Sequence, residues 1–244
     1  MAGELVAEQR RVTRLALEAL EPDGFALAGS GAIREHGFID RPTQDVDLFT
    51  VQSAQAHFSA ALDRMTEQLE RAGYNVVAVR RQAGFAEFEV TSSDGVQIGM
   101  DLGVDWRAEP PVRLEIGPVL ACDDAVGNKV AALFSRGEVR DYLDVDAIRQ
   151  TSRYSDEDLC RLAARTDAGF TPDYLARRLD WAIKILLSEV ADYEVTPTQL
   201  KAVKDRLTAW AEAIRQQSRR GSALEGSYEQ ADSAAENRRE NRDG

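Results

Sequence analysis

The sequence "GSGAIREHGFIDRPTQDVDL" occupies Gly29–Leu48 and ends in two aspartates that are one residue apart. The run "FALAG" before its Ser predicts a short buried strand, and "DVDLFTV" alternates as a second strand does. Side chains on a strand point alternately to opposite faces. Asp45 and Asp47 are therefore expected on one face, with Val46 and Leu48 directed into the core.

Two carboxylates on one strand face repel each other unless a cation lies between them. Magnesium prefers oxygen ligands and often takes one or two carboxylates together with substrate phosphates. An Asp-x-Asp tripeptide is common, so a solvated strand edge is the alternative explanation when it stands alone. Here Gly29 and Ser30 form a compact turn just before it, whose amides and hydroxyl suit a phosphate. We therefore expect Asp45 and Asp47 to bind Mg²⁺ or Mn²⁺ beside a phosphate.

A third carboxylate lies in the apolar segment "IGMDLGV" as Asp101. An acid within an apolar strand is costly to bury, so it needs a charged partner. If this strand adjoins the strand of Asp45 and Asp47, three acids converge on one metal site. Asp105, Glu87 and Glu89 are the other choices for the third acid.

A second block of charged residues has the sequence "NKVAALFSRGEVRDYLDVDAI". Lys129 and Arg136 are seven residues apart and share a helix face, while Arg140 and Asp144 are i, i+4 neighbours that can pair. The block alone is equally typical of a surface ion-pair network. With the first motif present, Lys129 is expected to neutralise a triphosphate. Asp141 or Asp144 would either hold Lys129 or Arg140 in place or deprotonate an acceptor hydroxyl.

The remaining sequence predicts an α/β region followed by helices. Capping patterns mark helix starts at "SDEDL" and "TPDYL", and the last segment is polar and predicted to be disordered. The expected helices are 3–20, 32–37, 53–73, about 123–137, 174–190 and 196–217. The expected strands are 25–29, 45–51, 74–81, 85–92 and 96–104. The expected divisions are 1–122, 123–220 and 221–244.

Composition limits the class of protein. The chain has 244 residues, of which 43% are hydrophobic, and a net charge of −12, as in a soluble globular protein. No apolar run approaches the roughly 20 residues that span a bilayer, and the N-terminus lacks a signal-peptide pattern. The two cysteines lie outside any Cys-x-x-Cys motif, so we expect a cytoplasmic protein without membrane association. The charge argues against a dedicated nucleic-acid coat but permits a local basic face.

The motifs together resemble one known family. The matching residues are "LAGS", "RPTQDVDL", "MDL" and the block that begins at Lys129, in that order. They are similar to the AbiEii/MenT toxin family within the polymerase-β-like nucleotidyltransferase superfamily. The resemblance covers about residues 25–150, and the later helices fit in kind without a signature.

The resemblance implies an α+β fold, with an N-terminal polymerase-β-like lobe and a C-terminal helical lobe. It implies a metal-dependent nucleotidyltransferase, a toxin controlled by a cognate antitoxin, that adds nucleotides from a nucleoside triphosphate (NTP) to the 3′ end of tRNA. Phosphate-binding residues would be Gly29, Ser30, Arg41, Thr43 and Lys129. Two alternatives remain open: nucleotidylation of an aminoglycoside-like molecule or a protein hydroxyl, and an inactive fold that only binds a nucleotide or a partner.

Overall fold

The computed structural model describes residues 2–41, 43 and 45–240. Seven strands form one sheet in the order β3-β4-β5-β2-β1-β7-β6. In chain order they are β1 (Ala26–Leu27), β2 (Asp45–Thr50), β3 (Asn75–Gln82), β4 (Phe85–Thr91), β5 (Gln97–Val104), β6 (Val112–Leu114) and β7 (Gly117–Val119). The α-helices are α1 (Ala2–Leu20), α2 (Gly29–Glu35), α3 (Phe58–Arg71), α4 (Cys122–Ser135), α5 (Val139–Gln150), α6 (Asp156–Thr166), α7 (Pro172–Asp180) and α8 (Pro197–Glu240). Short 3-10 helices are η1 (Glu21–Asp23), η2 (Gln52–His57), η3 (Trp181–Lys184) and η4 (Leu187–Tyr193).

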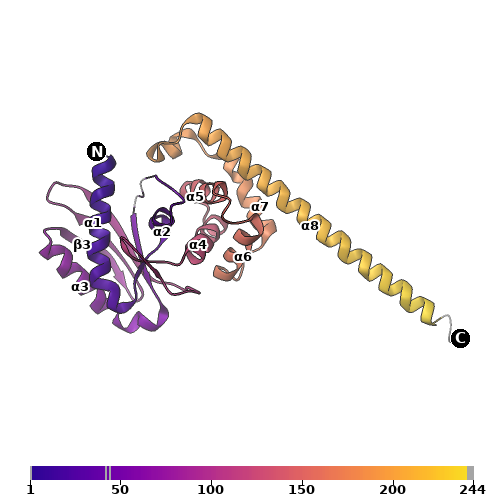
Figure 1. Cartoon of the computed structure of the whole chain (residues 1–244), viewed down its shortest axis with the longest axis horizontal. Coiled ribbons are helices and arrows are strands. Elements are labelled where there is room, and N and C mark those ends of the chain that lie inside the picture. The colour runs from indigo at the N-terminus through magenta and orange to yellow at the C-terminus, as the bar shows by residue number, and fades with distance from the viewer. Residues whose placement is uncertain (1, 42, 44, 241–244) are drawn as a thin grey trace.

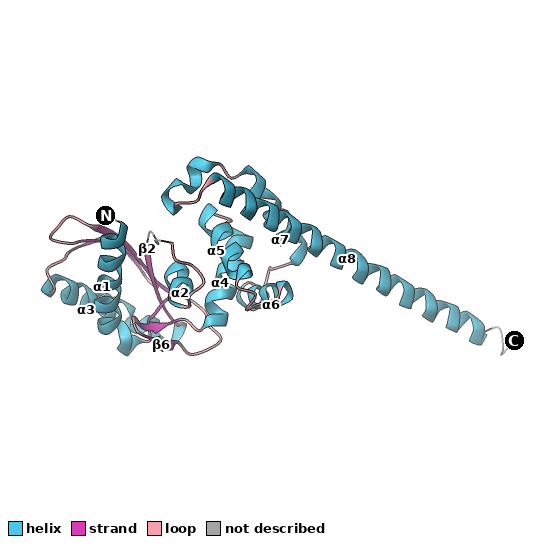
Figure 2. Ribbon diagram, turned by 45° about the horizontal axis from the view of Figure 1, so that its top comes forward, coloured by secondary structure: helices cyan, strands magenta, loops and turns pink. Residues whose placement is uncertain are grey.

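The sheet and the later helices lie side by side. Figure 1 shows the sheet with α1 and α3 at one end of the molecule and α4 to α7 next to it. Helix α2 lies between the two groups, and α8 continues away from them as one long helix (Figure 2). Among the described residues, no helix is both long enough and apolar enough to cross a membrane.

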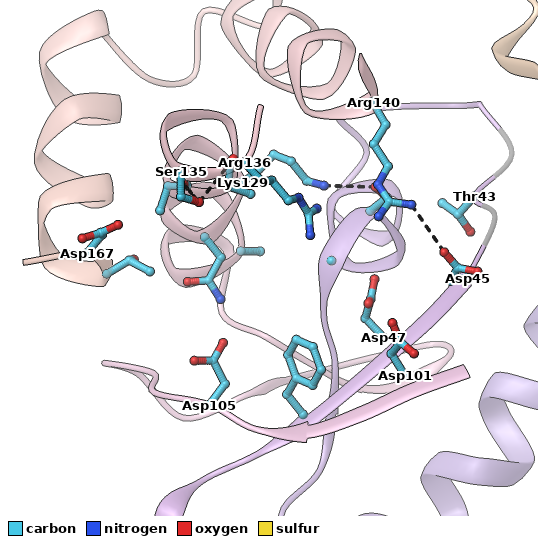
Figure 3. Close-up of a pocket in the computed structure, with 18 of the residues that line it drawn as sticks. Thr43, Asp45, Asp47, Asp101, Asp105, Lys129, Ser135, Arg136, Arg140 and Asp167 are labelled. Carbon is cyan, nitrogen blue, oxygen red and sulfur yellow. Dashed lines mark hydrogen bonds and ion pairs between the residues drawn. The ribbon is translucent and has the colours of Figure 1, made fainter. Parts of the chain in front are cut away.

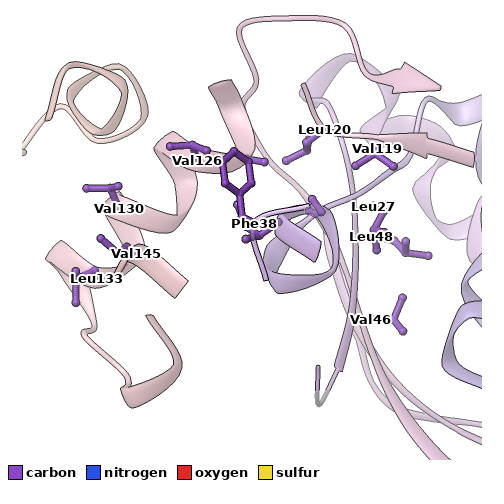
Figure 4. Close-up of a cluster of buried hydrophobic side chains, with 14 of the residues drawn as sticks. Leu27, Phe38, Val46, Leu48, Val119, Leu120, Val126, Val130, Leu133 and Val145 are labelled. Atoms are coloured by element: carbon purple, nitrogen blue, oxygen red, sulfur yellow. The ribbon is translucent and has the colours of Figure 1, made fainter. Parts of the chain in front are cut away.

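A shared hydrophobic core joins the sheet to the helices. Figure 4 shows Phe38 between the sheet residues Leu27 and Leu48 and the α4 residues Val126 and Val130. All five side chains are buried. Close packing of this kind resists displacement, because interiors are as dense as organic crystals. The helices are therefore held at a fixed position against the sheet.

Strand β2 lies in the middle of the sheet and follows the predicted alternation. Its residues Val46 and Leu48 are buried, whereas Asp45, Asp47 and Phe49 are half-buried on the opposite face. It pairs antiparallel with β1 and parallel with β5, so the sheet is mixed. The face that bears Asp45 and Asp47 is the one from which the functional site is built.

Most predicted elements are present, with shifts at their ends. All five predicted strands form, and the turn at Gly95 joins β4 to β5 as a hairpin. Helix α2 begins at Gly29 rather than at Ala32, so the residues expected to form a turn are its first residues. Strands β6 and β7 were not predicted, because three-residue strands in a Pro- and Gly-containing segment have too little periodicity.

The predicted helix at 174–190 is wrong. Helix α7 ends at Asp180, and Leu186 adopts an extended conformation whose N–H donates to Glu189 Oε2. This break lets η4 place Tyr193 against Arg41, with the guanidinium carbon 4.8 Å from the ring centroid. A tertiary contact of this kind overrides local helix propensity.

The C-terminal helix is longer than the sequence indicates. Helix α8 continues through residues 221–240, where the sequence predicts a disordered tail; residues 241–244 lie outside the described part. This segment is rich in Ala and Glu and contains no proline, which favours a helix despite its polarity.

Candidate active site

Three aspartates meet on one face of two adjacent strands. In the parallel pairing of β2 with β5, Asp47 lies directly opposite Asp101, and Asp45 lies opposite Gly99. Figure 3 shows Asp45, Asp47 and Asp101 together at one end of a cleft. Asp105 follows the end of β5 and lies away from them. Glu87 is the cross-strand neighbour of Asp101 on β4, so it is two strands away from Asp47.

Glycines make room for these carboxylates. Gly29 has φ +54°, and a Cβ added there would lie 1.8 Å from Asp47 Oδ2. A Cβ at Gly99 would lie 2.8 Å from Asp45 Oδ1. Only glycine lacks this atom and adopts a positive φ without cost. The chain therefore approaches the Asp47 carboxylate with bare backbone.

Replacing Gly29 tests this close approach. Gly29→Ala is expected to reduce activity at least about 100-fold, because a displacement of about 1 Å at a reacting centre costs that much. Gly37→Ala is the matched control: Gly37 also has a positive φ, +78°, but nothing lies within 4 Å of an added Cβ. Both variants should lose about 1–2 kcal/mol of stability from backbone strain. Equal activity of the two variants in steady-state assays would contradict the role of Gly29.

A buried polar network lies next to the carboxylates. Ser30 Oγ donates to Asp144 Oδ2 at 2.8 Å, and Lys129 Nζ lies 3.1 Å from both Ser30 Oγ and Asp144 Oδ2. Arg41 Nε donates to Asp144 Oδ1 at 2.9 Å, and Arg41 Nη2 lies 3.2 Å from Ser30 Oγ. The Asp144 side chain has no exposure, and that of Lys129 is 4% exposed. Asp144 thus connects three residues that the sequence places far apart.

Asp141 forms a second buried ion-pair centre at the start of α5. Arg136 Nε and Nη2 donate to its two oxygens at 3.0 and 3.1 Å, and Lys129 Nζ lies 3.5 Å from Oδ1. The backbone N–H of Glu138 also donates to Asp141, which caps the helix. Burial alone would raise the pKa of this carboxyl, but Arg136 and Lys129 outweigh it and hold the pKa below its usual value.

The pH dependence of stability follows from this shift. A carboxyl whose pKa is lower in the folded state stabilises the fold above its unfolded pKa of about 3.9, and the contribution is lost as the pH falls. Asp141→Asn is therefore expected to cost about 3 kcal/mol at pH 7 and clearly less at pH 3. Urea denaturation of wild type and variant at both pH values measures this. The exposed Asp94→Asn serves as control, and a difference that is constant with pH would contradict the assignment.

The i, i+4 spacing of Arg140 and Asp144 predicts an ion pair between them, but this pair does not form. Its Nη1 lies 3.4 Å from Asp45 Oδ2 across the cleft, and its Nη2 lies 2.8 Å from Glu138 Oε2. Asp144 is already occupied by Arg41 and Lys129 and faces away from solvent. Partners that are distant in the sequence therefore decide which ion pairs form, and helix spacing alone does not predict those partners.

Thr43 lines the cleft and is held in place by Gln9, a residue that no sequence motif marks. Its hydroxyl donates to Gln9 Oε1 at 2.8 Å, and Gln9 Nε2 donates to the Thr43 carbonyl at 3.0 Å. Both side chains are buried. Helix α1 thereby anchors the segment that leads into β2.

The negative charges of the carboxylate face repel one another. Burial, opposed in part by Lys129, raises the pKa of Asp47, with Asp45 adding to the increase. Burial and then the charges of Asp47 and Asp45 raise the pKa of Asp101 to about 6. A divalent cation bound between these carboxylates would offset their mutual repulsion and stabilise their ionised forms.

The donor set of this face therefore fits Mg²⁺ or Mn²⁺, with one adjustment. Among the described residues, no three His, Cys, Asp or Glu side chains converge as a finished metal-binding group. Asp45 is drawn toward Arg140 (Figure 3) and must turn to join Asp47 and Asp101. Oxygen-only ligands on neighbouring strands match the preference of Mg²⁺ for a few carboxylates completed by water and phosphate.

The three carboxylates, together with Ser30 and Lys129 of the network, line one cleft of about 440 Å³. Its lining residues come from β2, β5, α2, α4, α5 and the end of α6, so the sheet and the helices both contribute. At the carboxylate end they are Gly29, Ser30, Thr43, Asp45, Asp47, Asp101, Lys129, Arg136 and Arg140. A cleft with acids on one wall and cations on the other can hold a metal-bound polyphosphate between them.

Comparisons with known proteins identify the family and the fold. Residues 12–216 match the family model described as nucleotidyl transferase AbiEii toxin, Type IV TA system. No curated protein sequence matches the chain. MenT4, a nucleotidyltransferase toxin from Mycobacterium tuberculosis, has a similar structure with TM-score 0.56 at 16% identity, covering 85% of this chain and 84% of that one. JHP933 from Helicobacter pylori gives TM-score 0.54 at 17% identity, covering 92% and 97%. The predicted fold class is thereby confirmed.

Proposed function

Because the chain belongs to the AbiEii toxin family of nucleotidyltransferases, we propose that it is a metal-dependent toxin that transfers nucleotides from an NTP to the 3′ end of tRNA. Addition at this end would block aminoacylation and thereby translation. The observation that supports transferase chemistry most strongly is the pairing of Asp47 with Asp101 beside the buried Ser30–Lys129–Asp144 network.

We expect the acidic side chains to bind the metal and the Ser30 and Lys129 side chains to bind the triphosphate. Asp47 and Asp101, joined by Asp45, would hold one or two Mg²⁺ ions. The bound metal would supply Lewis acidity at the phosphates and at the attacking oxygen. Ser30 and Lys129 face these acids across the cleft and would contact the β- and γ-phosphates.

Lys129 would also offset the charge that grows on the leaving pyrophosphate. A preorganised cation in a site that excludes water stabilises developing charge without further reorganisation. Its ammonium is held by Asp141 and Asp144. Both acids are fully buried and engaged by cations, which favours a positioning role for them over the role of general base.

Arg41 would act through Ser30. It donates to Asp144 and lies against Ser30 Oγ, so it fixes the hydroxyl that contacts phosphate. Thr43, anchored by Gln9, would keep the segment before β2 in register. Both residues would act by positioning other groups of the site.

The acceptor is identified by a labelling screen. The protein is incubated with Mg²⁺ and each α-³²P-labelled NTP in turn, together with total tRNA, total cell protein or a panel of aminoglycosides. Label on tRNA that is removed by a 3′ exonuclease supports the proposal. Label only on protein or on an aminoglycoside would overturn the tRNA acceptor but keep the transferase. NTP binding without any transfer would favour a binding module.

A toxin of this kind requires control by a cognate antitoxin. Induced expression of the chain alone should arrest growth, and co-expression of a directly neighbouring gene product should relieve the arrest. Growth that is unaffected by an active, well-expressed chain would contradict the toxin assignment.

A further inference from the structure

The cleft continues beyond the carboxylates into a second part, which we call the distal end. Figure 3 shows Asp105 and Asp167 on the side of the cleft away from Asp45 and Asp101. The distal end consists of Phe49, Asp105, Asn128, Ser135, Thr166 and Asp167. None of these residues is used by the chemistry proposed above.

Phe49 provides an aromatic surface next to the carboxylate face. It follows Asp47 by two residues on β2, so its side chain points to the same side of the sheet. The ring lies over Gly103, where an added Cβ would come within 3.2 Å of the ring carbons Cδ1 and Cε1. A half-buried ring that lines the cleft near a phosphate site suits stacking of a nucleobase, which contributes about 1–3 kcal/mol per base.

The opposite wall is shaped by small residues of α4. Ala125 and Ala132 line the cleft on the same helix face as Asn128. Asn128 is the neighbour of Lys129, so one helix presents a cation toward the carboxylate end and an amide toward the distal end. Asn128 Oδ1 is buried without a hydrogen-bond partner among the described residues. A buried acceptor without a donor is costly, and a ligand N–H would relieve it.

Apart from the amide nitrogen of Asn128, the polar groups that the distal end offers to a ligand are acceptors. The carboxylates of Asp105 and Asp167 are each oriented by a backbone N–H, from Trp106 at 2.7 Å and from Gly169 at 2.8 Å. Ionised carboxylates only accept hydrogen bonds.

The two hydroxyls of the distal end add no donor for a ligand. Ser135 donates to the carbonyl of Ala131 at 2.9 Å, and Thr166 donates to that of Leu162 at 3.3 Å. The cationic side chains of the cleft, Lys129, Arg136 and Arg140, take part in the ion pairs described above.

We propose that the distal end binds the nucleobase of the NTP and selects cytosine or adenine, which carry an amino group where uracil carries a carbonyl, over uracil. This inference rests on the proposed nucleotidyltransferase function. Cytosine N4 and adenine N6 are amino donors, whereas uracil carries a carbonyl acceptor at the position of the cytosine amine. A carbonyl facing a carboxylate is repelled and leaves the protein acceptors unpaired, which rejects the wrong ligand more strongly than a lost contact does.

The test uses pairs of nucleotides that differ only in this group. Equilibrium binding of CTP against UTP, and of ATP against inosine triphosphate, is measured by calorimetry with Mg²⁺ and compared with transfer rates. We expect the amino member to bind at least about 10-fold more tightly in each pair that the cleft admits. UTP binding as tight as CTP binding, with no preference for ATP over inosine triphosphate, would overturn the inference and leave the proposed function standing. The absence of binding by any NTP would overturn both.

A variant assigns the preference to the distal end. Asp167→Asn replaces one acceptor by a group that also donates, so the preference for CTP over UTP should fall at least about threefold. The matched control is Glu157→Gln on α6, the helix that ends just before Asp167; Glu157 is exposed and outside the cleft lining, so this variant should keep the wild-type preference. Asn128→Ala should weaken binding of the amino-bearing nucleotide more than that of UTP. Wild-type preference in both Asp167→Asn and Asn128→Ala would contradict the assignment.

Discussion

Asp47→Asn is expected to lower the rate of nucleotide transfer about 10³-fold, which corresponds to about 4 kcal/mol of transition-state stabilisation. Asparagine keeps the shape of the side chain but loses the charge that a divalent cation requires. Asp47 is the best-supported metal ligand among the acids, because the backbone of Gly29 leaves room for its carboxylate and Asp101 lies opposite it. Single-turnover transfer of a radiolabelled nucleotide measures the effect.

The same substitution should leave the fold intact. It removes one of three negative charges that repel each other on the strand face, so the denaturation midpoint without divalent metal should be unchanged or higher. Asp94→Asn, in the exposed turn between β4 and β5, is the control for both measurements. An Asp47→Asn enzyme that keeps a tenth or more of wild-type activity would contradict the metal-binding role of Asp47.

Asp144→Ala is expected to cost about 3–5 kcal/mol of folding stability. It leaves Lys129 buried and removes the carboxylate that both Arg41 and Ser30 contact. Lys129 would keep only its longer contact with Asp141, at 3.5 Å, and a buried charge that loses its nearer partner is costly. Guanidinium denaturation followed by circular dichroism measures the loss.

Asp146→Ala is the matched control on the same helix. Asp146 is also buried and ion-paired, but its partner Arg206 is 37% exposed and can be solvated when the pair is broken. We therefore expect this variant to lose about 1–2 kcal/mol and to retain activity. Equal losses in the two variants would show that Asp144 is an ordinary helix residue and not the centre of the network.

The strand face was predictable from the sequence because it depends on local alternation. The period of two in "DVDLFTV" places Asp45 and Asp47 together, and the same period indicates Phe49, although its position was not used. The choice of Asp101 as third acid depends on which strands are neighbours. The sequence alone does not show that the two strands are neighbours. The structure shows it, because β2 pairs in parallel with β5 and Asp47 lies opposite Asp101.

The partners of the charged side chains were less predictable. Spacing on α5 suggests Arg140 with Asp144, but the tertiary fold brings Arg41, 103 residues away, to Asp144 and turns Arg140 toward Asp45. The end of α7 at Asp180 has the same cause, since the contact between Tyr193 and Arg41 is not encoded locally. Nothing in the sequence pattern marks Asn128 or Asp167.

We propose that the carboxylate face and the Lys129 network act together as one metal-dependent nucleotidyltransferase site. The most direct measurement is incorporation of α-³²P label from the four NTPs into total tRNA by wild type and Asp47→Asn, each with Mg²⁺ or with EDTA. We expect 3′-terminal labelling by the wild type with Mg²⁺ and a signal at background in the other three reactions. Labelling by the wild type in EDTA, or equal labelling by Asp47→Asn with Mg²⁺, would contradict it.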